Sequence, residues 1–93
     1  MAALELRVEI ADWQGEVWSG QASFFTAPSV EGPIGIYPRH EPLLAILRAG
    51  EVKVAPSPPG PDVKVRVTGG FLSVDSDIVT VIADEAELAA SVK

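Results

Sequence analysis

The sequence contains no cysteine among its 93 residues and only one histidine. Without cysteine the chain has no disulfide bond, no thiolate zinc ligand and no cysteine nucleophile. A zinc site needs three or four protein ligands, and the single histidine, His40, supplies only one of them. We therefore expect no metal site, no cofactor and no catalytic residues in this chain.

Positive charge is also scarce, because 7 Lys and Arg face 13 Asp and Glu and leave a net charge of −6. Binding of a phosphate backbone needs clustered positive charge, so we expect no nucleic-acid partner. Long apolar runs are missing too. The longest, Leu43–Leu47, is far shorter than the roughly 20 residues that span a bilayer, so we expect no direct membrane insertion.

The chain nevertheless has the composition of one folded domain, with 47% hydrophobic and 22% charged residues. Apolar and polar residues alternate over Leu4–Ile10 and Val63–Val67, a period of two that indicates β-strands. Apolar residues on both sides of Ile78–Ile82 predict a strand buried on both faces. Short strands separated by Gly, Pro and Asp turns favour an all-β sandwich or barrel.

Two segments do not fit a strand. Residues 84–90 begin with acidic residues and continue with good helix formers, which predicts a short C-terminal helical turn. The segment Ala55–Pro61 carries four prolines and predicts a stiff hairpin loop. Its two overlapping P-x-x-P spacings leave recognition by a polyproline-binding domain as an alternative.

Two small motifs suggest chemistry and are better explained by structure. Gly32-Pro33-Ile34-Gly35 has the G-x-x-G spacing of an RNA-clamping loop, but Glu31 precedes it and strands flank it, which favours a turn. A hydrolase using His40 and Glu41 would need an activated serine, and no serine lies in a G-x-S-x-G sequence. We expect His40 to be a structural or interface residue.

The stretch Glu31–Leu44 is more specific than its parts, and it resembles a signature of the epsilon subunit of bacterial F-type ATP synthase. Four further landmarks of that family follow in the same order over about residues 4–87: Val17-Trp18-Ser19-Gly20, Leu47–Val54, Thr68–Val74 and Val79–Glu87.

The resemblance implies a flattened β-sandwich of two five-stranded sheets. It also implies a non-catalytic central-stalk subunit between the gamma subunit and the c-ring, which couples proton flow to ATP synthesis at the cytoplasmic face of the bacterial cell membrane. A free-standing β-sandwich adaptor or ligand-binding module remains the alternative, because a fold does not fix a function.

The family's loop that matches Val30–His40 is the one presented to the c-ring. By this resemblance we expect Glu31 and His40 to line the contact, with Gly32, Pro33, Gly35 and Pro38 shaping the loop. The family often has an acidic residue where Pro33 stands, so the acidic role is expected of Glu31. For the gamma subunit, whose binding face should be partly apolar, we expect contacts from the apolar segment Leu43–Leu47, with Leu43, Leu44 and Leu47, and from Arg48.

The family's members typically continue into two antiparallel helices that inhibit ATP hydrolysis and in some members bind ATP. We expect residues 1–86 to form the sandwich domain and residues 87–93 to be the start of that helical region. This chain reaches Lys93 without the two helices and without the family's ATP-binding motif, [IL]-D-x-x-R-A. We therefore expect no helix-mediated inhibition and no nucleotide binding.

Overall fold

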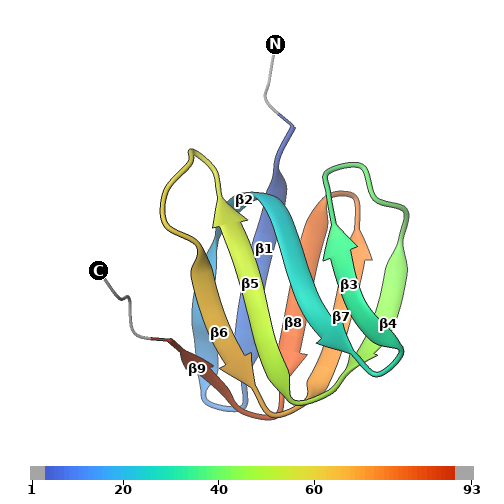
Figure 1. Ribbon diagram of the computed structural model, residues 1–93, viewed down its shortest axis with the longest axis vertical. Coiled ribbons are helices and arrows are strands. Elements are labelled where there is room, and N and C mark those ends of the chain that lie inside the picture. Colours follow the sequence, from blue (N-terminus) through green and yellow to red (C-terminus); the bar gives the residue numbers. More distant parts are fainter. Residues whose placement is uncertain (1–3, 90–93) are drawn as a thin grey trace.

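The computed structural model describes residues 4–89, which contain strands and no helix (Figure 1). The nine strands are β1 (Leu6–Asp12), β2 (Gly15–Ser29), β3 (Gly32–Ile36), β4 (Leu43–Leu47), β5 (Gly50–Pro56), β6 (Val63–Val67), β7 (Gly70–Asp75), β8 (Ile78–Ala83) and β9 (Ala86–Leu88). The prediction of an all-β fold is therefore confirmed.

The strands form two stacked layers that share β2 (Figure 1). The first half of β2 pairs with β1, and its second half pairs with β3 and β5. The register of β2 against β5 shifts between Ala22 and Phe24, where β2 passes from one layer to the other. We call β2–β1–β8–β7–β4 the first layer and β3–β2–β5–β6–β9 the second. Each layer then has five strands, as expected, because β2 counts in both layers and residues 4–89 form nine strands.

The core lies between the layers and is built by the alternation seen in the sequence. In β1, Leu6, Val8 and Ile10 are buried while the intervening charged residues are exposed. In the second layer Val52 lies directly opposite Val65, and both are fully buried. Burial of each large apolar side chain stabilises the fold by about 1.5–3 kcal/mol, so alternation alone supplies most of the driving force.

The prediction that Ile78–Ile82 is buried on both faces is wrong. Val79 and Val81 are fully buried, but Ile78 and Ile82 are 47% and 45% exposed on the outer side of the first layer. The strand lies between β1 and β7 within its layer. No other part of residues 4–89 forms a third layer over it, so one face of β8 stays open.

The prediction of a helical turn at residues 84–90 is wrong over the residues that the structure describes. Ala86–Leu88 forms β9 and pairs with β6, so the sheet continues past the boundary that we expected after residue 86. Asp12 holds this strand through Oδ2, which accepts from the backbone N of Ala86 at 3.0 Å. Residues 90–93 lie outside the described residues.

Residues 57–61 of the proline-rich segment lie in the loop between β5 and β6, as predicted (Figure 1). Ala55 and Pro56 instead end β5 and pair with β2. Ser57 fastens the loop to the start of the chain, because its Oγ donates to Oε2 of Glu5 at 2.6 Å. The backbone N of Ser57 also donates to the carbonyl of Gln21 at 3.0 Å. The segment is thus held against β1 and β2 at one end of the sandwich.

Candidate functional site

Strand β3 divides the residues expected at the c-ring into two groups. Glu31 lies in the β2–β3 turn, and Gly32 and Pro33 begin β3. Pro38 and His40 follow the opposite end of that strand. A strand of five residues spans about 17 Å, so the two groups lie at opposite ends of the sandwich. The structure does not bring Glu31 and His40 together.

The β2–β3 turn is fixed by three local features. The Oγ of Ser29 accepts from the backbone N of Glu31 at 3.1 Å. The backbone N of Val30 donates to the carbonyl of Ile46 at 2.9 Å, which ties the turn to β4. Gly32 has a φ of +125°, a conformation that costs glycine little and other residues more. The position of Glu31 is therefore set by the backbone on both sides of it.

Gly35 lies in the middle of β3, beneath an aromatic pair. A Cβ at Gly35 would lie 3.1 Å from the ring of Phe24. That ring in turn packs on Tyr37, with 4.4 Å between ring centroids and 33° between planes. The Phe24 ring approaches so closely that a side chain at this position would crowd it. Gly35 therefore allows the Phe24 ring to pack over β3 on the outer side of the second layer.

The turn after β3 contains Pro38, Arg39 and His40. Arg39 has a φ of +72°, and its backbone N donates to Oδ1 of Asp77 at 2.6 Å. The Nδ1 of His40 lies 2.7 Å from the carbonyl oxygen of Glu41. A carbonyl oxygen can only accept, so Nδ1 is the donor in this hydrogen bond. His40 is half-buried and holds the turn that leads into β4.

The residues expected at the gamma subunit point in different directions. Leu44 is 73% exposed on the outer side of β4, whereas Leu47 is only 3% exposed and belongs to the core. Leu43 is half-buried on the inner side. Arg48 follows β4, and it lines a hollow with Pro28, Pro33 and Glu51 at the same end of the sandwich as Glu31. Leu47 is therefore not available for surface contact.

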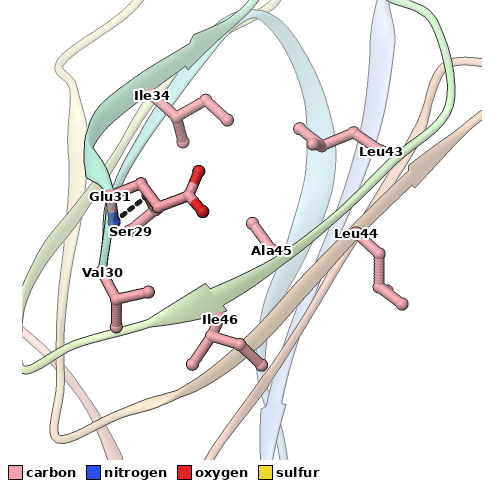
Figure 2. Close-up of a pocket in the computed structure, with 8 residues that line it drawn as sticks. All are labelled: Ser29, Val30, Glu31, Ile34, Leu43, Leu44, Ala45 and Ile46. Carbon is pink, nitrogen blue, oxygen red and sulfur yellow. Dashed lines mark hydrogen bonds between the residues drawn. The ribbon is translucent and has the colours of Figure 1, made fainter.

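A hollow of about 190 Å³ lies between the β2–β3 hairpin and β4 (Figure 2). Its lining, which we call the edge groove, is Ser29, Val30, Glu31, Ile34, Leu43, Leu44, Ala45 and Ile46. In Figure 2 the carboxylate of Glu31 points into the hollow between Ile34 and Ala45. The groove thus joins Glu31, expected at the c-ring, with Leu43 and Leu44, expected at the gamma subunit. Ala45 and Ile46 belong to the segment expected at the gamma subunit. Sequence reasoning missed Ile34, whose place here depends on the hydrogen bond from Val30 to Ile46.

The outer side of the first layer carries an apolar row next to polar and charged residues, among them Arg7, Glu9 and Asp75. Ile46, Phe71 and Ile82 lie directly opposite one another on β4, β7 and β8, and are 58%, 41% and 45% exposed. Such exposed patches on a protein mark sites of interaction. We call the exposed set the apolar face: Leu44, Ile46, Phe71, Ile78 and Ile82. The sequence carried a signal for it in Ile78 and Ile82, which periodicity assigned to a buried strand.

The outer side of the second layer carries charged residues on β5, β6 and β9, beside the aromatic pair of Phe24 and Tyr37. Lys53 lies directly opposite Lys64, and Arg66 lies between Glu51 and Glu87 across three strands. All five side chains are exposed. The two outer sides of the sandwich therefore differ, because the exposed row Ile46–Phe71–Ile82 lies on the first layer and the opposed lysines lie on the second.

Residues 4–89 contain neither a candidate metal site nor a candidate membrane-spanning helix. No three His, Asp or Glu side chains lie close enough together to hold a metal ion in this part of the chain. None of its segments is a helix with the length and apolar character needed to cross a membrane.

The family model for the "ATP synthase, Delta/Epsilon chain, beta-sandwich domain" matches residues 5–89. The ATP synthase epsilon chain of Neisseria gonorrhoeae is 41% identical over 81 residues, which are 87% of this chain and 58% of the relative. That of Nitrosomonas eutropha is 40% identical over 79 residues, 85% of this chain and 56% of the relative. This chain thus spans somewhat more than half the length of these relatives.

Two solved structures share the fold. A chain of the Euglena gracilis mitochondrial ATP synthase, described as OSCP/F1/c-ring in rotational state 1, superposes with a TM-score of 0.84 and 19% identity over 95% of this chain and 56% of its own. A chain of the Tetrahymena thermophila mitochondrial ATP synthase, described as central stalk and c-ring, gives a TM-score of 0.69 and 17% identity over 94% of this chain and 69% of its own.

Proposed function

The chain belongs to the family of ATP synthase delta/epsilon β-sandwich domains, and from that membership we propose that it is a central-stalk subunit of an F-type ATP synthase. In this role it is non-catalytic, links the gamma subunit to the c-ring, and couples proton flow to ATP synthesis. It works as a peripheral protein at the cytoplasmic face of a bacterial membrane. Its relatives are named as epsilon chains of that complex, which supports the assignment.

The observation that carries this proposal is the difference between the two outer sides of the sandwich. A linker in a stalk needs a surface that stays against a permanent partner, and such surfaces are more apolar than the rest of a protein. The apolar face has that character, with the row Ile46–Phe71–Ile82 at its centre. The second layer presents opposed lysines and an arginine between two carboxylates, which suit contact with water.

We assign the apolar face to the gamma subunit. Among the four residues expected there, Leu44 belongs to this face and is the most exposed of its members. Leu43 contributes from the inner side of the same strand, in the edge groove. Leu47 is in the core and makes no surface contact. The remaining contacts in this assignment come from Ile46, Phe71, Ile78 and Ile82. Arg48 lies outside the apolar face, beside Pro33 and Glu51.

We assign the end of the sandwich that carries Glu31, Gly32 and Pro33 to the c-ring. Glu31 is exposed, and its backbone is fixed by Ser29 and by the bond from Val30 to β4. An acidic side chain on a rigid turn suits a basic partner loop, because little ordering is needed on binding. Gly35, Pro38 and His40 lie away from this end, and we propose that they maintain the shape of β3 and its following turn.

Co-elution tests the assignment. The 93-residue chain is mixed with the gamma subunit of the same organism and passed over a sizing column, alone and with c-ring in detergent. A stable one-to-one complex with gamma, which then also retains the c-ring, is the expected result. Separate elution of the chain from gamma in both runs would contradict the proposal and favour a free-standing β-sandwich module.

A further inference from the structure

One edge of β4 has no strand beside it along the edge groove. The carbonyl of Ile46 accepts from Val30, so the peptide groups of residue 46 point away from β7. Residues two apart in a strand direct their N–H and C=O groups the same way, so those of Leu44 also face away from β7. On that side β4 pairs with β2 only at Leu47, opposite Ser29. Within residues 4–89, Leu44 therefore has no strand partner there.

This edge is unprotected, whereas the free edges of β3 and β9 are not. In β3, Pro33 lies opposite Pro28, and a proline cannot donate to an added strand. The outer edge strand β9 has only three residues, and one of them is the charged Glu87. The sequence of β4 is Leu-Leu-Ala-Ile-Leu, with neither proline nor charge. An apolar free edge of this kind is a template for a strand from another chain.

We propose that the gamma subunit adds an extended segment to the free edge of β4, seated in the edge groove; this inference rests on the proposed function. The groove and the apolar face are continuous, because Leu44 and Ile46 belong to both. The partner that covers the apolar face therefore reaches the groove without a gap. Ile34, Leu43 and Ala45 line the hollow, and the carboxylate of Glu31 points into it. The added segment therefore has apolar side chains at alternate positions and a polar group where it passes Glu31.

Hydrogen exchange of single amides tests the added strand. The amide of Leu44 is measured by NMR in the ¹⁵N-labelled chain, free and saturated with unlabelled gamma subunit. A new backbone hydrogen bond is expected to slow its exchange by at least about 100-fold. The amide of Asp62, in the β5–β6 loop, serves as the control and is expected to keep its rate. An unchanged rate at Leu44 in a complex that has formed would overturn the inference and leave the proposed function standing.

A pair of matched variants separates the groove from the apolar face. Ala45→Met fills the hollow from the inner side of β4 without altering the apolar face, and is expected to weaken gamma binding at least about tenfold. Ala55→Met places the same change on β5, where Ala55 lies opposite Phe24, and is expected to bind like the parent chain. Thermal melts check that both variants fold. If both variants fold and bind gamma equally well, the added strand is contradicted. If the parent chain itself does not bind gamma, the inference fails together with the proposed function.

Discussion

The backbone N of Arg39 donates to Oδ1 of Asp77 at 2.6 Å, joining turns that lie 38 residues apart in the chain. The carbonyl of the same Asp77 accepts from the backbone N of Arg7 at 2.8 Å. One residue thus fastens the turn before β4, the β7–β8 turn and the start of β1. Asp77 itself has a φ of +63°, which Asp and Asn adopt more readily than other non-glycine residues.

Replacing Asp77 tests this junction. Asp77→Ala removes the acceptor and places alanine at a positive φ, and is expected to cost about 2–3 kcal/mol of unfolding free energy. Asp77→Asn keeps an oxygen acceptor and the backbone preference, so its cost is expected to stay below about 1 kcal/mol. Urea denaturation measures both. Equal losses in the two variants would show that the hydrogen bond to Arg39 contributes nothing.

Gly70 and Gly15 form a natural comparison, because both have a positive φ, of +136° and +124°. A Cβ at Gly70 would lie 2.2 Å from the carbonyl oxygen of Ile82, whereas one at Gly15 would meet nothing within 4 Å. Gly15→Ala is expected to cost about 1–3 kcal/mol through backbone strain alone. Gly70→Ala adds a clash with backbone and is expected to cost more than about 4 kcal/mol. Denaturation midpoints that agree between the two would contradict the close packing of β7 on β8.

Asp12 is expected to hold β9 in place. Its Oδ2 accepts from Ala86 at 3.0 Å, and its Oδ1 accepts from Gln14 at 2.9 Å. Asp12→Ala removes both acceptors and is expected to cost about 1–3 kcal/mol. Hydrogen exchange should report the loss first at Ala86 and Leu88. If those amides exchange no faster in the variant, β9 is held by its pairing with β6 alone.

A charge within the apolar face should weaken the gamma complex. Ile82 is partly exposed and opposite Phe71, so Ile82→Lys can fold with its ammonium in water. Burying that charge at the centre of an interface is expected to cost about 2 kcal/mol or more, roughly a 30-fold loss of affinity. The matched control is Lys53→Glu on the second layer. Calorimetric titration measures both affinities. If Lys53→Glu binds gamma more weakly than Ile82→Lys does, gamma contacts the second layer and not the apolar face.

Charge reversal at Glu31 should weaken docking on the c-ring. Glu31→Lys leaves the backbone bonds of the β2–β3 turn intact, because these use the N of Glu31 and of Val30. Removal of a favourable rim contact and introduction of repulsion are expected to reduce retention of the ring about tenfold at low salt. Glu87→Lys makes the same change on β9, where docking should persist. Equal retention by the two variants would remove Glu31 from the contact.

Alternation predicted the strands well because burial of one face is a local property. The segments Leu4–Ile10 and Val63–Val67 give β1 and β6, and their valines and isoleucines fill the core as expected. Periodicity does not say whether a second apolar face meets solvent or protein, so Ile78 and Ile82 were assigned to the interior. Their exposure follows from the number of layers, which is a property of the whole chain.

The C-terminal segment shows tertiary pairing overriding local propensity. Residues 86–88 have good helix formers, yet Arg66 and Val67 of β6 offer an open edge that they complete as β9. The candidate site was also beyond local reasoning. Val30–His40 looked like a single loop, and only the structure shows that β3 within it carries Glu31 and His40 to opposite ends. The edge groove depends on one backbone bond between Val30 and Ile46.

Because β2 runs through both layers, the two halves of the sandwich are mechanically in series along one covalent chain. Sliding one layer over the other would have to break the β1 pairing on one half of β2 or the β3 and β5 pairing on the other half. A pull on the β4 side is passed along that strand to the β5 side instead of being lost as slip between two sheets. The body therefore resists twisting as a single stiff unit.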